Sequence, residues 1–203
     1  MGLIGMSHYY SKNPTVSSRE TTIKAKLKDR EWEFLTDAGV FSKGGVDFGT
    51  RLLIETVEIT DGDTLLDLGC GYGVVGIVLG AETPAGLITM SDINERAVEL
   101  AKKNCKKYQI TNATVIASDG FENIPHQEFK HIITNPPIRA GKAKIYQLFD
   151  ETTKYLGHSG SLWVVMHKKH GAESAIKKLE NLYKSVKIVN KKSGYHIIKA
   201  DNS

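Results

Sequence analysis

Short apolar runs alternate with longer amphipathic segments along the chain from Asp63 onward. Apolar runs of about four to eight residues that end at turn residues are typical of buried strands, and segments with a 3.6-residue period are typical of helices. We expect strands at Thr64–Leu68, Leu87–Asp92, Ala113–Ser118, His131–Asn135, Ser161–His167, Val186–Val189 and Tyr195–Lys199. Strands that alternate with helices form a mostly parallel sheet, so the pattern predicts a seven-stranded α/β domain with helices on both faces. The last two strands flank the turn-like Lys191–Gly194 and should close the sheet as a β-hairpin.

The segment Asn94–Tyr108 shows the helical pattern most clearly. Asn94 is a favourable N-cap, acidic residues come early and lysines come late, as the helix dipole prefers. One stripe of this helix is apolar and should cover the sheet, and it consists of Ala97, Leu100, Ala101 and Cys105.

The N-terminal part of the chain follows a different pattern. Thr22–Leu27 and Glu31–Leu35 alternate apolar with polar residues around Lys28–Arg30, which predicts a β-hairpin. A glycine-rich stretch, Phe41–Arg51, then leads into the helix-like Leu52–Val57. We expect residues 1–40 to be an N-terminal extension and not an independent domain, with residues 41–203 forming the main domain.

The bulk properties fit one globular domain. The chain has 203 residues, of which 40% are hydrophobic and 25% charged, and no stretch approaches the roughly 20 apolar residues that span a bilayer. Met1–Met6 is followed by polar residues, without the apolar core of a secretory signal. We therefore expect a soluble cytoplasmic protein without membrane association. Cys70 and Cys105 have neither CxxC nor Cys/His ligand spacing, which argues against a metal site and against a disulfide framework.

The formal charge of +4 is mild, but the lysines occur in adjacent pairs. Such clusters suit a polyanionic partner such as a nucleic acid, and they also suit solvated helix faces and strand ends. The pairs are Lys102–Lys103, Lys106–Lys107, Lys168–Lys169, Lys177–Lys178 and Lys191–Lys192.

The stretch Asp67–Gly73 places three glycines at the turn from the first strand of the expected sheet to a helix near Val74–Leu79. Ligands bind at the carboxyl ends of strands in open α/β sheets, and glycines let backbone amides approach them closely. Gly71–Gly76 also fits the dinucleotide pattern GxGxxG, which taken alone is a weak signal. An acid at Asp67 suits the cationic amino-acid end of S-adenosylmethionine, whereas a pyrophosphate prefers a helix N-terminus without a neighbouring anion.

Two further acids follow the next two strands. Asp92 ends the second strand, where its carboxylate could accept from both ribose hydroxyls, and Asp119 follows the third, where it could accept from the adenine amine. Structural alternatives stay open, because Asp92 could cap the helix that begins near Asn94 and Asp119–Gly120 could be an ordinary turn. Three acids at successive strand ends together favour a cofactor that contains a nucleoside.

The fourth strand runs directly into Asn135–Ile138, the most specific motif in the chain. Proline lacks an N–H and holds the preceding residue extended, so the local carbonyls are turned outward. The Asn135 side-chain oxygen and the Pro136 carbonyl could then both accept from one –NH2 group and align its nitrogen for methyl transfer without a strong base. The alternative for an isolated Asn-Pro-Pro is a strand end closed by a turn.

These motifs resemble those of the class I, Rossmann-like S-adenosylmethionine-dependent methyltransferases that act on planar amines. With Phe41–Leu53 and Asn135–Lys142 included, nearly the whole chain resembles the small-domain (MTS) family and the catalytic domain of RsmC-type 16S ribosomal RNA guanine-N2 methyltransferases. The resemblance implies S-adenosyl-L-methionine as cofactor and a catalytic loop of Asn135, Pro136, Pro137 and Ile138. It implies a cofactor site of Phe41, Thr50, Asp67, Gly69, Cys70, Gly71, Gly73, Asp92, Ile93, Asp119, Gly120 and Asn135, with Asp47 as a further cleft residue.

Two departures from the family bear on the substrate. Ile138 stands where an aromatic residue usually stacks on the target, which disfavours adenine-N6 DNA methyltransferases and glutamine methyltransferases. The founding RsmC-type enzymes carry two copies of the fold and this chain has one, so we expect a monomer or a homodimer.

The sequence therefore predicts methylation of guanine N2 in RNA, with ribosomal RNA or the small ribosomal subunit as the partner. Arg139, Lys142 and Lys144 follow the catalytic loop, where they could meet phosphates around a flipped-out base or begin a solvent-facing helix. The alternatives are methylation of a protein glutamine at N5, a module that binds S-adenosylmethionine or RNA without catalysis, and a nicotinamide oxidoreductase. The last leaves Asn135–Pro137 unexplained.

Overall fold

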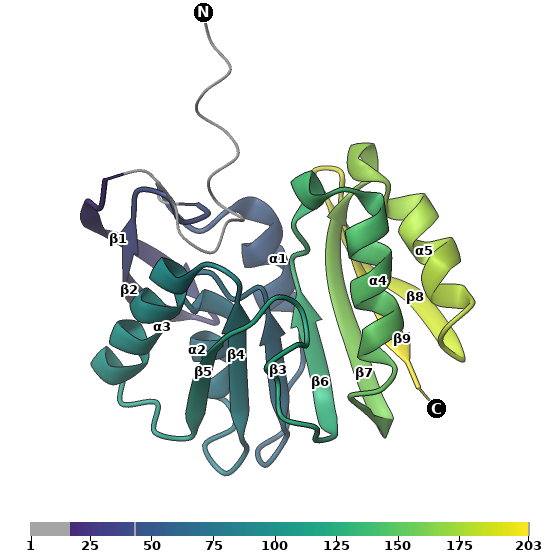
Figure 1. Cartoon of the computed structure of the whole chain (residues 1–203), viewed down its shortest axis with the longest axis horizontal. Coiled ribbons are helices and arrows are strands. Elements are labelled where there is room, and N and C mark those ends of the chain that lie inside the picture. The colour runs from purple at the N-terminus through teal and green to yellow at the C-terminus, as the bar shows by residue number, and fades with distance from the viewer. Residues whose placement is uncertain (1–16, 43, 203) are drawn as a thin grey trace, which may run out of the picture.

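A computed structural model describes residues 17–42 and 44–202, which form a central sheet between two layers of helices (Figure 1). The strands of this sheet are β3 (Leu65–Leu68), β4 (Ile88–Asp92), β5 (Ala113–Ala117), β6 (Phe129–Thr134), β7 (Leu156–His167), β8 (Ser185–Lys192) and β9 (Tyr195–Asp201). Their order is β5-β4-β3-β6-β7-β9-β8. The first five in this order are parallel, and β9 runs antiparallel to both of its neighbours. The predicted parallel sheet with a closing hairpin is thus confirmed.

Each face of the sheet has its own helices and its own apolar cluster. One face carries α1 (Phe48–Thr56), α2 (Val74–Gly80) and α3 (Glu95–Lys107), and the other carries α4 (Lys142–Thr152) and α5 (Ala172–Glu180). Successive residues of one strand serve opposite faces, so Ile133 of β6 packs in the first cluster and Ile132 in the second. Within the described ranges, none of the helices has the length and apolar character needed to cross a membrane.

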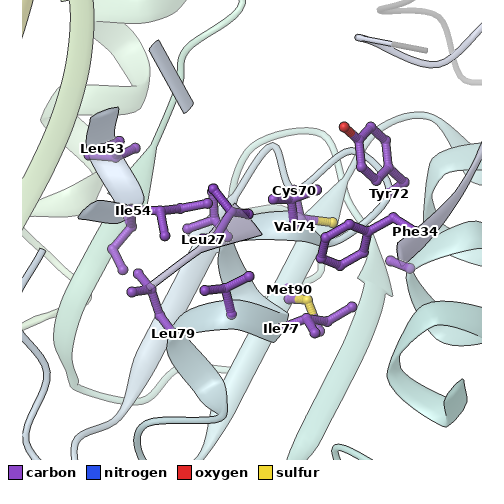
Figure 2. Close-up of a cluster of buried hydrophobic side chains, with 14 of the residues drawn as sticks. Leu27, Phe34, Leu53, Ile54, Cys70, Tyr72, Val74, Ile77, Leu79 and Met90 are labelled. Atoms are coloured by element: carbon purple, nitrogen blue, oxygen red, sulfur yellow. The ribbon is translucent and has the colours of Figure 1, made fainter. Parts of the chain in front are cut away.

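The predicted N-terminal hairpin is present as a separate two-stranded sheet of β1 (Glu20–Leu27) and β2 (Arg30–Asp37). It packs on the layer of α1, α2 and α3, and Figure 2 shows Leu27 and Phe34 among the side chains of this shared core. The side chain of Asn104 in α3 connects the hairpin edge to the glycine loop. Its Oδ1 accepts from Leu35 N at 2.9 Å, and its Nδ2 donates to Leu35 O at 3.0 Å and to Tyr72 O at 2.8 Å. The hairpin therefore braces the loop that follows β3. Residues 1–16 of the predicted extension lie outside the described residues.

Local patterns located most elements, and the exceptions have physical reasons. The helix predicted at Leu52–Val57 begins earlier, at Phe48, because Asp47 caps it by accepting from Thr50 N at 3.2 Å. Glycines around this start hid the helical period. The helix predicted at Asn94–Tyr108 spans Glu95–Lys107. Asn94 is its N-cap, Tyr108 is its C-cap, and the predicted apolar stripe is buried.

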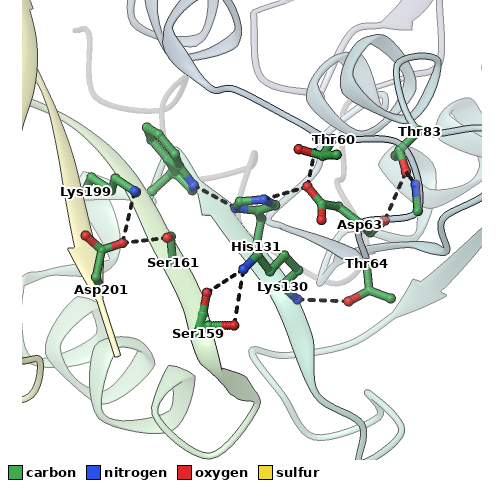
Figure 3. A network of polar contacts seen from close by, with 12 residues as sticks. Thr60, Asp63, Thr64, Thr83, Lys130, His131, Ser159, Ser161, Lys199 and Asp201 are labelled. Atoms are coloured by element: carbon green, nitrogen blue, oxygen red, sulfur yellow. Dashed lines mark hydrogen bonds and ion pairs between the residues drawn. The ribbon is translucent and has the colours of Figure 1, made fainter. Parts of the chain in front are cut away.

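A polar network, buried at Trp163 and His131 and exposed at Lys130, joins the amino ends of the central strands (Figure 3). His131 Nε2 contacts Asp63 Oδ2 at 3.1 Å, and Trp163 Nε1 donates to His131 Nδ1, also at 3.1 Å. Lys130 donates through its ammonium group to the Ser159 carbonyl at 2.7 Å. The network links the segment before β3 to β6 and β7 and fixes the register of the strands that carry the site.

Candidate functional site

A cavity opens at the carboxyl ends of the parallel strands, where open α/β sheets bind their ligands. Its volume is about 290 Å³, near the lower end of the range of small-molecule pockets, about 300–1,000 Å³. The predicted site residues that line it are Phe41, Asp47, Thr50, Asp67, Gly69, Cys70, Gly71, Asp92, Ile93, Asp119, Gly120, Asn135, Pro137 and Lys144. The fold thus gathers residues from four strand ends, the loop before α1 and helix α4 around one space.

The glycine loop after β3 is built against the end of β4. The amides of Gly69 and Cys70 both donate to the Ser91 carbonyl, at 2.8 and 2.9 Å. Gly71 has a φ of +56°, in the left-handed region that favours glycine, and its amide donates to Asp92 Oδ2 at 2.8 Å. These bonds hold the loop open and direct the acids at the two strand ends toward the cavity.

Asp67 lies buried beneath the loop, against the start of α2. Its Oδ2 accepts from Gly76 N at 2.8 Å. Burial raises the pKa of Asp67 to about 7, the Gly76 hydrogen bond opposes that rise, and the negative charge of Asp92 adds to it. A carboxylate therefore occupies the helix N-terminus that the pyrophosphate of a dinucleotide would need. A cationic ligand group would instead favour the ionised form of Asp67.

The GxGxxG match has a packing explanation in this chain. A Cβ on Gly76 would lie 2.4 Å from the Met90 sulfur and 3.2 Å from Asp67 Oδ2. The glycine lets α2 approach β3 and β4 closely, so the match does not require a dinucleotide.

Asp92 is not the N-cap of α3, which is Asn94, and its carboxylate instead accepts from backbone amides of the loops around the cavity. Its Oδ1 accepts from Asn94 N at 2.9 Å and its Oδ2 accepts from Gly71 N, while Asn94 itself caps α3. Burial raises the pKa of Asp92, and the backbone N–H groups of Asn94, Gly71 and Ile93 oppose the rise. Because a carboxylate has about four acceptor sites, Asp92 retains capacity for ligand hydroxyls.

Asp119 and Lys144 form an ion pair that the sequence did not anticipate. Lys144 Nζ lies 2.9 Å from Asp119 Oδ1, and this hydrogen bond raises the pKa of Lys144. The sequence left two roles open for Lys144, which were to meet RNA phosphates beyond the catalytic loop or to point to solvent from the start of a helix. Its ammonium group instead lies in the cavity, against the acid that was expected to accept from adenine.

Asn135 is oriented by α1. Its Nδ2 donates to Thr50 Oγ1 at 3.0 Å, and Thr50 is held in turn by the bond from its backbone N–H to the Asp47 carboxylate. With Nδ2 engaged, Oδ1 is the amide atom available to accept from a substrate amine. The Pro137 carbonyl accepts from Ala140 N at 2.8 Å, which leaves the Pro136 carbonyl as the candidate second acceptor.

The remaining residues of the predicted site lie outside the cavity. Ile138 and Lys142 line a smaller hollow together with Tyr146 and His170. Ile138, which was assigned to the catalytic loop, therefore does not line the main cavity. Arg139 is exposed on the 3₁₀ helix η1 (Ile138–Ala140). Pro136, the second residue of the Asn135–Ile138 motif, is buried and does not line the cavity. Gly73 is the N-cap of α2.

Sequence reasoning missed several residues that line the cavity. Two kinds of local signal could have found some of them: Ser91 directly precedes Asp92, and Ala140, Lys144 and Leu148 recur at helical spacing. The others lie at the ends of β3 and β6, in the first turns of α2 and α3, or in loops, where no pattern separates a lining residue from its neighbours. The missed lining residues are Val40, Ser42, Leu68, Tyr72, Val74, Val75, Ser91, Asn94, Ala97, Ser118, Thr134, Ala140 and Leu148.

Known proteins resemble this chain in sequence and in structure. Residues 31–199 match the family model of the methyltransferase small domain. An uncharacterized protein of Bacillus subtilis, YbxB, is 47% identical over 195 residues, which cover 95% of this chain and 97% of the relative. Ribosomal RNA small subunit methyltransferase C of Haemophilus influenzae is 38% identical over 131 residues, which cover 63% of this chain and 39% of the relative.

Among solved structures, the fold is similar to the T. thermophilus 16S rRNA N2 G1207 methyltransferase RsmC in complex with AdoMet and guanosine. The TM-score is 0.82 at 23% identity, and the match covers 94% of this chain and 52% of that one. The chain thus spans about half the length of the RsmC proteins that it resembles.

Proposed function

The chain belongs to the family of methyltransferase small domains, and we propose that it methylates an exocyclic amine in RNA, namely guanine N2 of ribosomal RNA. Membership confirms the family predicted from the sequence and its cofactor, S-adenosyl-L-methionine. We further propose guanine N2 as the methylated amine, ribosomal RNA as the substrate, and the roles of individual residues described below.

The chemistry of the cavity fits this cofactor. Asp67 is a buried carboxylate that a cationic amino-acid group would stabilise, Asp92 offers acceptor sites to ribose hydroxyls, and Asp119 lies where it can accept from the adenine amine. Bound S-adenosyl-L-methionine supplies an electrophilic methyl group on a sulfonium sulfur. The residues that would hold it lie on the side of the cavity formed by β3, β4 and β5.

The observation that carries the proposal is the hydrogen bond between Asn135 and Thr50, because it leaves Asn135 Oδ1 as the acceptor at the cavity wall. Asn135 Oδ1 and the Pro136 carbonyl accept the two hydrogens of a planar –NH2 group and favour its pyramidal form. The nitrogen lone pair is then exposed and oriented, which lowers the barrier without a strong base. The proton becomes acidic once the nitrogen is methylated, so it can leave to water.

Guanine N2 in ribosomal RNA is supported by the relatives and by one residue of the motif. The RsmC relatives are named as ribosomal RNA methyltransferases, and the similar solved structure is a guanine-N2 enzyme in complex with guanosine. Ile138 departs from the aromatic residue common in adenine and glutamine methyltransferases. The positive formal charge of +4 also favours a polyanionic substrate.

The test is to incubate the protein with methyl-labelled cofactor and undermodified ribosomal RNA or small subunits, and then to digest the RNA to nucleosides. Label in N2-methylguanosine is the expected result. Label in protein glutamine, or in another nucleoside only, would show that the proposed substrate is wrong.

Two variants separate binding from chemistry. Asn135→Ala should abolish methyl transfer and leave the cofactor affinity close to that of the unaltered protein, because Asn135 is assigned to the amine. Asp92→Ala should weaken S-adenosyl-L-methionine binding in calorimetry. Full activity in the Asn135 variant would contradict the proposed orientation of the amine.

A further inference from the structure

The ion pairs separate the five lysine pairs into two groups. Three of the pairs contain a lysine that is bound to an acid: Lys102 to Glu99, Lys103 to Glu20, Lys107 to Glu33 and Lys178 to Asp150. Among the described residues, Lys168–Lys169 and Lys191–Lys192 have no acidic partner within ion-pair distance, and all four side chains are exposed.

These two lysine pairs lie at one corner of the fold. Lys168–Lys169 belongs to the 3₁₀ helix η2 (Lys168–His170) after β7, and Lys191–Lys192 ends β8 before the hairpin turn. Lys168 N donates to Gly194 O at 2.8 Å, which fastens the two turns together. Burial and then the charges of Lys191 and Lys168 lower the pKa of His196, with Glu173 partly opposing them. The four lysines therefore give the corner a net positive charge that Glu173 offsets only in part.

A row of rings leads from this corner toward the start of α1, where Asp47 and Thr50 line the cavity. It consists of Phe48, Tyr195, His167 and His170, called the ring ledge below. Neighbouring centroids are 5.6 Å apart for Phe48 and Tyr195, 4.8 Å for Tyr195 and His167, and 5.4 Å for His167 and His170. Phe48 is 38% exposed, although large apolar side chains are usually buried.

The ring ledge is built into the fold on the side where Asn135 lies. Phe48 opens α1, two positions before the Thr50 that orients Asn135. The Tyr195 ring packs on the backbone of Gly49. A Cβ on Gly49 would lie 2.8 Å from that ring. Tyr195 pairs with His167 of β7, and β7 pairs with β6, whose end leads into Asn135. Two strand spacings separate β9, which carries Tyr195, from β6, so Tyr195 lies on the order of 10 Å from the catalytic strand, and His167 on β7 lies one spacing closer.

We propose that the ring ledge and the two unpaired lysine pairs form the docking surface for a single-stranded RNA segment next to the target nucleotide. Bases stack on aromatic and histidine rings irrespective of sequence, and lysines beside the rings neutralise the phosphates that join those bases. At this distance from the catalytic strand the ledge receives a base next to the target, so it adds stacking outside the target site and does not act on the target base itself. This inference deepens the proposed function and rests on RNA being the substrate.

The test measures binding of a fluorescent single-stranded oligoribonucleotide of about 12 nucleotides by anisotropy, beside cofactor binding by calorimetry. Phe48→Ala should raise the Kd for RNA about 5- to 100-fold, from the loss of one base stack, and should leave the cofactor Kd unchanged. Leu87→Ala is the matched control, since Leu87 is 60% exposed at the start of β4, and it should change neither Kd.

Two double variants test whether the unpaired lysines contact RNA phosphates. Lys168→Ala with Lys169→Ala should reduce the slope of log Kd against log salt by about 1.4, because each phosphate contact on single strands contributes about 0.7. Lys102→Ala with Lys103→Ala removes the same charge from the α3 surface and should leave the slope unchanged. Equal effects of the two double variants would overturn the proposed surface, since only net charge would then matter.

Other outcomes distinguish this inference from the proposed function. If RNA is methylated while Phe48→Ala and the Lys168–Lys169 variant bind it as the unaltered protein does, the docking surface is wrong and the function stands. If single-stranded RNA binds through the ledge but no nucleoside is methylated, the proposed function is wrong and the surface stands. Tighter binding to an RNA duplex, or binding to anionic phospholipid vesicles and not to RNA, would overturn the surface.

Discussion

The side-chain nitrogen of Asn135 donates a 3.0 Å hydrogen bond to the hydroxyl of Thr50, a residue 85 positions away in the chain. The bond decides which end of the Asn135 amide faces the cavity. Thr50 is itself fixed by Asp47, the N-cap of α1, so the start of that helix sets the orientation of the proposed acceptor. In the proposed reaction, helix α1 would therefore contribute to the geometry through the Thr50 side chain, which has no reactive role of its own.

Replacing Thr50 by valine removes the acceptor and keeps the shape of the side chain. The Asn135 amide then loses its anchor and can rotate, and an unpaired buried donor costs about 1–3 kcal/mol. We expect kcat/KM for RNA to fall about 10- to 100-fold in the Thr50→Val variant, with cofactor affinity changed by less than about 3-fold. Steady-state kinetics with labelled cofactor would measure the first quantity and calorimetry the second.

Thr50→Ser is the control for this prediction because it keeps the hydroxyl and removes only a methyl group. Its activity should stay within about 3-fold of the unaltered protein. If the serine variant is as impaired as the valine variant, packing around Thr50 matters more than the hydrogen bond.

Sequence patterns located the strand ends and therefore the acids at them, because each lies next to a strand in the chain. Asp67 and Asp92 line the cavity for that reason. Patterns could not reveal contacts made across the sheet, such as the pair of Asp119 with Lys144, which depends on how α4 packs after β6. The same limit applies to Ile138, which the resemblance assigned to the catalytic loop: its place in the smaller hollow depends on the η1 turn, which no period predicts.

Cofactor affinity should depend on pH through Asp67. Its pKa is raised to about 7 by burial, so the carboxyl is largely neutral in the free protein below that pH. A cationic ligand binds the ionised form, and the affinity for S-adenosyl-L-methionine should therefore fall up to about tenfold for each pH unit below about 7 and level off above it. Calorimetry between about pH 5.5 and 8 would measure this profile.

The stability of the free protein should change with pH in the direction opposite to the cofactor affinity. A carboxyl whose pKa is raised on folding stabilises the fold most below its unfolded pKa, and that contribution is lost as pH rises through about 7.

Asp67→Asn should flatten the pH profile of the cofactor affinity. Gly44→Ala, a change in the loop before α1 with nothing within 4 Å of the new Cβ, should retain that profile. A flat profile in the unaltered protein would rule out Asp67 as the group that titrates.

Gly76→Ala should destabilise the fold, because the new Cβ would lie 2.4 Å from the Met90 sulfur. Overpacking of this kind costs about 1–3 kcal/mol, so the midpoint of urea unfolding should fall accordingly. Gly44→Ala again serves as the control and should leave the midpoint unchanged. An unchanged midpoint in Gly76→Ala would mean that α2 can move away from β4 without loss.

The His131 network should make stability fall in mild acid. Trp163 donates to Nδ1, so the ring is neutral, with its proton on the Nε2 that faces Asp63. Burial lowers the pKa of His131, with Asp63 partly opposing it. Below about pH 6.5 the unfolded chain takes up a proton that the folded chain resists, so stability present at higher pH is lost by up to about 1.4 kcal/mol per pH unit.

Urea unfolding of the unaltered protein and of His131→Gln, compared between about pH 5 and 7.5, isolates this contribution because Asp67 and the other carboxyls are common to both. The difference in unfolding free energy should shrink as pH falls, since only the unaltered chain contains this titrating group. Trp163→Phe removes the donor to Nδ1 and should raise the pKa of His131, which the imidazole resonances report in an NMR titration. A pKa that does not move in Trp163→Phe would show that burial alone, and not the indole hydrogen bond, keeps the ring neutral.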